Sequence, residues 1–77
     1  MALIRLLLVD DHDVVRTGLK MLLESQPDMQ IVAEASSGKQ AFELANLTKP
    51  DVIVMDITLP DISGIEITRQ IKANQAG

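Results

Sequence analysis

Three aspartates each stand directly after an apolar run of the chain. Asp10 and Asp11 follow the run at residues 3–9, and Asp56 follows the run at residues 51–55. An aspartate carboxylate can attack phosphorus to form an aspartyl-phosphate. Carboxylates that are crowded together repel one another, and Mg²⁺ is commonly held by one or two carboxylates, waters and phosphate oxygens. If the three side chains converge, they therefore predict the anionic half of a Mg²⁺-dependent phosphoryl-transfer site.

Each of these acidic residues also has a plain structural interpretation. Asp10, Asp11 and Asp13 precede a predicted helix, so any one of them could cap its first turn or complement the helix dipole. Asp56 could be a turn former after a buried strand. His12 has no matching ligand elsewhere in the chain, and we expect it to be a surface residue. Only the combination of the acidic pair with Asp56 favours the chemical interpretation.

Three short strands are predicted to position these carboxylates. The aliphatic run at residues 3–9 is typical of a strand that is buried on both faces of a parallel sheet. Residues 29–35 are partly β-branched and lie between Pro27 and the Ser-Ser-Gly segment at residues 36–38, which predicts a second strand. The apolar run at residues 51–55 predicts a third.

A helix is predicted after each strand. Ser37 and Gln40 have the spacing of a capping box, and so have Ser63 and Glu66. The second helix is expected to end at Lys49, because the residue before Pro50 is pushed out of the α region. The apolar residues at helical spacing are Val15, Leu19, Leu22 and Leu23 in the first helix, Ala41, Leu44 and Ala45 in the second, and Ile67 and Ile71 in the third.

The alternation of strands and helices predicts an α/β fold with a parallel sheet in one domain. Crossovers between parallel strands are right-handed. If the second and third strands flank the first, the first and third strands border a topological switch point, where ligands of open α/β sheets bind. Periodicity alone fits the strand order 3-2-1 as well as 2-1-3.

Composition excludes several classes of protein. The net charge is -4 and the Lys and Arg residues are scattered, so this segment is not expected to bind nucleic acid by itself. The chain contains no Cys, which excludes a disulfide framework and a thiolate metal site. Its apolar runs are far shorter than the roughly 20 residues of a membrane span, and no signal peptide is recognisable. We therefore expect a cytoplasmic protein without membrane partners.

With these residues in view, the whole sequence resembles the receiver domains of bacterial two-component response regulators. Residues 7–12 (Leu-Leu-Val-Asp-Asp-His) resemble the family's acidic pair after the first strand. Residues 54–60 (Val-Met-Asp-Ile-Thr-Leu-Pro) resemble its phosphoacceptor strand, and Gly64 follows four residues after Pro60. Residues 15–19 (Val-Arg-Thr-Gly-Leu) are similar to the NarL/FixJ subgroup, which is usually joined to a LuxR-type helix-turn-helix output domain. The resemblance implies a flavodoxin-like (CheY-like) sheet with strand order 2-1-3.

The resemblance also implies a role for each site residue. Asp56 would be the phosphorylated nucleophile and also a metal ligand, and Asp11 would bind Mg²⁺ directly. Asp10 would act on the metal through water, and the backbone carbonyl of Thr58 would be a further ligand. The phosphoryl donor would be a phosphohistidine on a sensor histidine kinase. The protein would thus be a signalling module and not an enzyme that acts on an external substrate.

A complete receiver has five strands and five helices, so residues 1–77 are expected to be its N-terminal portion, a partial (βα)3 unit before strands 4 and 5. DNA would be contacted only through an effector domain outside this chain. The third strand and part of the first helix would then be uncovered. We therefore expect the chain either to form a homodimer or an oligomer that exchanges elements, or to be the surviving part of a longer receiver.

Two other functions fit parts of the sequence. One is a degenerate receiver-like interaction or dimerisation module that does not take part in phosphotransfer. The other is a Mg²⁺-dependent phosphohydrolase, because Asp56 and Thr58 are faintly similar to the nucleophile motif of the haloacid dehalogenases. That motif has a second Asp at the position of Thr58, and no general acid is recognisable in this chain.

Overall fold

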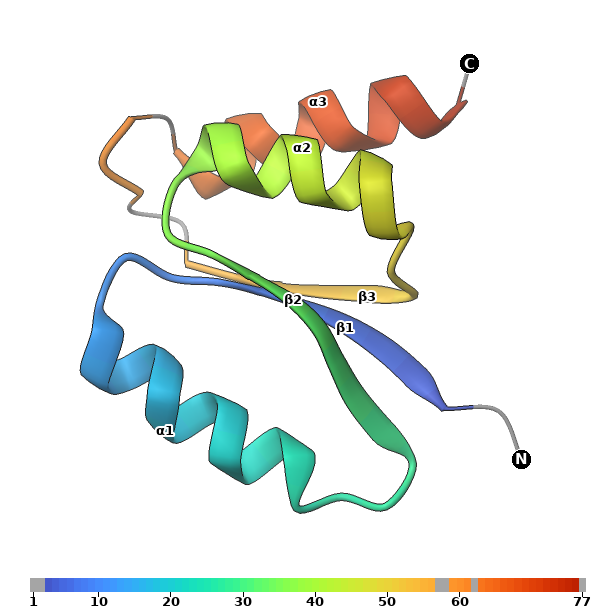
Figure 1. Ribbon diagram of the computed structural model, residues 1–77. Coiled ribbons are helices and arrows are strands. Elements are labelled where there is room, and N and C mark those ends of the chain that lie inside the picture. Colours follow the sequence, from blue (N-terminus) through green and yellow to red (C-terminus); the bar gives the residue numbers. More distant parts are fainter. Residues whose placement is uncertain (1–2, 57–58, 62, 77) are drawn as a thin grey trace.

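The computed structural model describes residues 3–56, 59–61 and 63–76 of the 77-residue chain. Strands and helices alternate along it (Figure 1). The strands are β1 (Ile4–Val9), β2 (Met29–Ala35) and β3 (Val52–Met55), and the helices are α1 (Asp13–Glu24), α2 (Gly38–Thr48) and α3 (Gly64–Ala76). All six predicted elements are confirmed. The strands end at the predicted residues, while β1 and β3 each begin one residue later than expected.

The three strands form a parallel sheet in the order β2-β1-β3. This is the order implied by the resemblance, and one of the two that periodicity allowed. Leu7 and Leu8 in β1 are fully buried, because a central parallel strand is covered on both faces. The register between β1 and β2 shifts between Leu6 and Leu7, which pair with Ile31 and Ala33.

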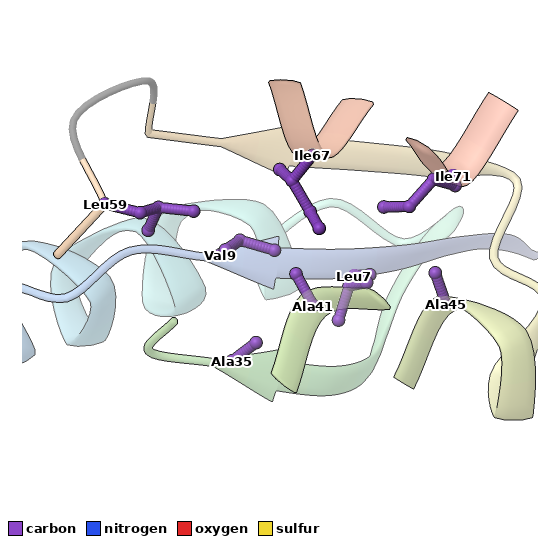
Figure 2. Packing of buried hydrophobic residues seen from close by; sticks show 8 residues of the cluster. All are labelled: Leu7, Val9, Ala35, Ala41, Ala45, Leu59, Ile67 and Ile71. Carbon is purple, nitrogen blue, oxygen red and sulfur yellow. The ribbon is translucent and has the colours of Figure 1, made fainter. Parts of the chain in front are cut away.

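The helices cover both faces of the sheet, with α2 and α3 on one face and α1 on the other (Figure 1). Right-handed crossovers that run in opposite directions across the sheet require α1 and α2 to lie on opposite faces. Figure 2 shows the main cluster of buried side chains, which lies between the sheet and the helices α2 and α3. It comprises Leu7, Val9, Ala35, Ala41, Ala45, Leu59, Ile67 and Ile71. The alanines on β2 and α2 allow α2 to lie close to the sheet.

The opposite face of the sheet is covered less completely. Leu6 and Leu8 alternate with Leu7 and Val9 along β1, so they point to the face that α1 covers, and both are buried. No residue of α1 itself is buried. The exposed apolar side chains of α1 are Val14, Val15, Met21 and Leu22. The expected uncovered apolar surface on this helix is therefore confirmed.

The ends of α2 show how the chain satisfies its backbone groups. At the N-terminus, Ser37 Oγ accepts a hydrogen bond from Gln40 N at 3.2 Å, as the capping box predicts. The Gln40 side chain, however, accepts from Ser36 N and not from Ser37. At the C-terminus, Lys49 adopts a left-handed conformation with φ 48°, which ends the helix before Pro50. None of the helices in the described part of the chain is long and apolar enough to cross a membrane.

Candidate functional site

Backbone hydrogen bonds bring the aspartates together at the carboxyl end of the sheet. Asp10 N donates to Ala35 O at 3.0 Å, and Asp56 N donates to Val9 O at 2.9 Å. Each bond continues the parallel ladder by one residue beyond the strand. Asp10 and Asp56 therefore leave neighbouring strands side by side, next to the point where the connections diverge to opposite faces of the sheet.

The predicted convergence of the three carboxylates is found in the structure. One ligand atom from each of Asp10, Asp11, His12 and Asp56 can be chosen so that all four lie within 4.8 Å of one another. The Asp10 side chain is 10% exposed, that of Asp56 18% and that of Asp11 29%. The acidic cluster, defined as Asp10, Asp11 and Asp56, is thus partly buried and open to solvent on one side.

None of the acidic residues before α1 caps this helix. The N-cap is His12, which makes no side-chain capping bond. Asp10 Oδ1 instead accepts a hydrogen bond from His12 N at 2.8 Å, which closes the turn between β1 and α1. Asp13 lies in the first turn and its Oδ1 accepts from Arg16 Nη2 at 2.7 Å. The capping interpretation of Asp10 and Asp11 is therefore wrong.

The sequence suggested that His12 has no partner, but its side chain lies beside three carboxylates. Its side chain is 62% exposed, as expected, but Nδ1 lies 3.0 Å from Asp10 Oδ1, 3.1 Å from Asp11 Oδ1 and 3.6 Å from Asp56 Oδ2. The hydrogen bond to Asp10, followed by the charge of Asp11, raises the pKa of His12 above its ordinary value. The turn after the acidic pair places the imidazole of His12 next to the carboxylates of the acidic cluster. This position was not expected from the sequence.

One carboxylate oxygen of the acidic cluster, on Asp11, is buried without a hydrogen-bond donor among the described residues. Asp11 Oδ1 is buried and accepts no hydrogen bond among the described residues, although His12 Nδ1 lies nearby. A buried carboxylate oxygen without a donor is unfavourable unless a cation or another donor compensates it. This oxygen and the two neighbouring carboxylates fit a small divalent cation with oxygen ligands.

Arg16 holds the turn that carries the acidic pair. Its side chain is 19% exposed, and Nη1 donates to Asp10 O at 2.6 Å. Nε lies 3.4 Å from Glu34 Oε1 on β2, and Glu34 Oε2 also pairs with Lys20 Nζ at 3.1 Å. Arg16 therefore connects the acidic cluster through the backbone to α1 and to the edge of β2.

Asp61, in the loop after β3, accepts two hydrogen bonds that the sequence did not indicate. Asp61 Oδ1 accepts from Gly38 N at 2.8 Å, and Asp61 Oδ2 accepts from Lys39 N at 3.0 Å. The loop that follows Asp56 is thereby attached to the N-terminus of α2. Thr58, whose backbone carbonyl was expected to bind Mg²⁺, lies outside the described residues.

Comparison with known sequences identifies relatives among bacterial regulators. A family model described as the response regulator receiver domain matches residues 6–77. The transcriptional regulatory protein LiaR of Bacillus subtilis (strain 168) is 49% identical over 69 residues, which cover 90% of this chain and 33% of that protein. The response regulator protein VraR of Staphylococcus saprophyticus is 46% identical over 69 residues, with the same coverage. The chain spans about a third of the length of these curated relatives.

Comparison with solved structures gives the same result. A LuxR-family response regulator from Aurantimonas sp. SI85-9A1 has a TM-score of 0.93 and 44% identity over 97% of this chain and 54% of that one. The receiver domain of NarL from Mycobacterium tuberculosis has a TM-score of 0.94 and 27% identity over 97% of this chain and 60% of that one. The six elements and their strand order are thus those of part of a CheY-like fold.

Proposed function

Because the chain belongs to the response regulator receiver domains, and its relatives are of the LuxR/NarL type, we propose that Asp56 accepts a phosphoryl group from a sensor histidine kinase. The observation that carries the proposal is the convergence of Asp10, Asp11 and Asp56 at the carboxyl end of β1 and β3. A phosphoryl-transfer site of this kind acts by positioning and by charge compensation.

In this mechanism an Oδ atom of Asp56 attacks phosphorus, the new O–P bond forms, and the N–P bond of the donor phosphohistidine breaks. The backbone bond from Asp56 N to Val9 O holds the nucleophile in place. Asp11 would hold Mg²⁺ directly, Asp56 would be a further carboxylate ligand, Asp10 would hold the ion through water, and Thr58 would provide a backbone carbonyl. When bound, Mg²⁺ supplies positive charge that offsets the charges on the carboxylates and the phosphoryl oxygens.

The wider role follows from the relatives. LiaR is named a transcriptional regulatory protein. We therefore infer that phosphorylation of Asp56 controls a DNA-binding output domain in the cytoplasm, and that the chain does not turn over an external substrate. Neither the phosphohydrolase nor the degenerate module without phosphotransfer is favoured by the relatives.

Intact-mass measurement tests the proposal. The chain is incubated with acetyl phosphate and Mg²⁺, beside an Asp56→Asn variant. We expect one phosphoryl adduct on the native chain and none on the variant. Asp13→Asn is the matched control, because Asp13 is an exposed acidic residue outside the acidic cluster, and it should keep the adduct. An adduct on Asp56→Asn, or none on a folded native chain, would contradict the proposal.

We further propose that the chain associates as a homodimer or through exchanged elements. Two features support this. β3 lies at the edge of the described sheet, with Val52 46% exposed, and an edge strand with apolar residues offers backbone groups for pairing with another chain. The second feature is the exposed apolar side chains of α1, whose contact with water is energetically unfavourable. Sedimentation velocity over a range of concentrations should show a species larger than the monomer, and a monomer at all concentrations would contradict the proposal.

A further inference from the structure

We propose that His12 is a direct ligand of the metal at the acidic cluster, and that its imidazole makes the site bind transition-metal cations such as Zn²⁺ in preference to Mg²⁺. The inference rests on the proposed function, since it concerns the same metal site. The inference adds His12 to the metal ligands, which in the proposed function do not include a histidine.

The position of the imidazole carries the proposal. Nδ1 faces the carboxylate oxygens of all three aspartates at 3.0, 3.1 and 3.6 Å. The four ligand atoms lie within 4.8 Å of one another. Two atoms on opposite sides of one ion are up to about 4.4 Å apart, twice a metal–ligand bond of about 2.2 Å. Small side-chain rotations therefore bring all four atoms within bonding distance of a single cation.

The backbone keeps His12 over the acidic cluster. His12 N donates to Asp10 Oδ1, and His12 O accepts from Arg16 N at 2.8 Å. Both ends of the residue are thus held by the turn and by the first turn of α1. The side chain itself is 62% exposed, so its ring can adjust to a cation without displacing buried neighbours.

The unused oxygen of the acidic cluster indicates where the cation would lie. Asp11 Oδ1 is buried without a hydrogen bond among the described residues, and it lies 3.1 Å from His12 Nδ1. A cation between these two atoms would satisfy both of them. The carboxylate would gain the partner it lacks, and the imidazole would contribute its lone pair.

The chemistry of this donor set determines the selectivity. Carboxylates alone suit Mg²⁺ and Mn²⁺, whereas imidazole suits Zn²⁺ and other transition metals. Three carboxylates with one imidazole therefore favour cations that accept both kinds of ligand. Removal of the imidazole is expected to weaken Zn²⁺ binding about tenfold and to change Mg²⁺ binding by less than about twofold.

Electron spin-echo spectroscopy of the Mn²⁺-loaded chain tests the inference directly. The chain contains one histidine, so an imidazole ¹⁴N coupling to Mn²⁺ can come only from His12. We expect this coupling in the native chain and its loss in His12→Ser, a variant that retains a favourable N-cap residue for α1. Asp13→Asn serves as the matched control and should retain the coupling. Calorimetric titrations with Zn²⁺ and Mg²⁺, at one mildly alkaline pH, measure the two affinities in parallel.

The outcomes separate this inference from the proposed function. A ¹⁴N coupling that His12→Ser removes, with the selective loss of Zn²⁺ affinity, supports it. Mn²⁺ binding without an imidazole coupling would overturn the inference and leave the acidic metal site intact. If a folded native chain binds none of the three metals, the metal site of the proposed function fails, and the role of His12 fails with it.

Discussion

Arg16 is the residue that ties the acidic cluster to the surrounding fold. Most of its side chain is shielded from solvent, and its guanidinium donates to the backbone carbonyl of Asp10, one residue before the proposed Mg²⁺ ligand Asp11. A charged donor to a partly buried carbonyl stabilises more than an exposed ion pair does. Arg16 therefore positions the acidic pair, although it does not itself contact the proposed phosphoryl group.

Replacement of Arg16 tests this role at the residue scale. Arg16→Ala should lower the free energy of unfolding by about 1–3 kcal/mol, because the Asp10 carbonyl loses a charged hydrogen-bond donor and Glu34 loses an ion-pair partner. Urea unfolding followed by circular dichroism measures the change. Lys20→Ala is the matched control, since Lys20 also pairs with Glu34 but is more exposed, and it should have a much smaller effect. Equal effects of the two substitutions would show that the bond to Asp10 contributes little.

At the scale of single elements, the N-terminus of α2 is capped by two separate parts of the chain. Its first four backbone N–H groups have no partner further back in the helix. Ser37 Oγ accepts from Gln40 N, Ser37 O accepts from Ala41 N, and the Asp61 carboxylate accepts from Gly38 N and Lys39 N. The N–H groups of the first three helical residues, Gly38, Lys39 and Gln40, are thus satisfied by side chains, and Ala41 N makes the first regular helical bond. The Asp61 contacts also fasten the loop that follows β3 to α2.

Asp61→Ala should lower the free energy of unfolding by about 1–2 kcal/mol, because two amides at the positive end of the helix dipole lose a carboxylate. Chemical denaturation measures the loss, and amide hydrogen exchange at Gly38 and Lys39 should become faster. Glu43→Ala is a suitable control, as Glu43 is an exposed acidic residue within α2. Unchanged exchange at Gly38 and Lys39 would show that the Asp61 contacts do not protect the helix end.

At the scale of the whole molecule, the fold has one well-packed layer and one sparsely covered layer. α2 and α3 bury the cluster drawn in Figure 2, whereas no residue of α1 is buried. β3 is paired on one side only, with β1. Among the described residues, α1 carries four exposed large apolar side chains, whereas β3, α2 and α3 each carry one, namely Val52, Leu47 and Ile65.

A charge placed on β3 tests the proposed association. Val52→Lys should reduce self-association at least severalfold, because a lysine on an edge strand opposes pairing with a second strand. Sedimentation velocity measures the effect. Val14→Lys is the comparison, since Val14 is equally apolar but lies on α1 and is 87% exposed. If Val14→Lys disrupts association and Val52→Lys does not, α1 and not β3 forms the contact.

Much of the site was predictable from the order of residues. Asp10 and Asp56 directly follow aliphatic strands, with Asp11 next to Asp10, and the carboxyl ends of parallel strands lie at one edge of a sheet. The elements were predictable for the same local reason, since periodicity and capping residues act over a few positions. The phosphoacceptor role of Asp56 and the metal roles of Asp10, Asp11, Asp56 and Thr58 stay predictions. The assignment of residues 1–77 to the N-terminal portion of a receiver also stays a prediction.

The sequence by itself thus determined the six elements, the three carboxylates and the resemblance to receiver domains, because each depends on neighbouring residues. The tertiary structure confirmed the strand order that the resemblance implied and that periodicity alone had left open. It also decided that Asp61 reaches α2 across 22 and 23 positions of the chain, and that His12 faces the acidic cluster. Such contacts depend on how separate elements and turns pack in space, and the spacing of residues along the chain does not contain that information.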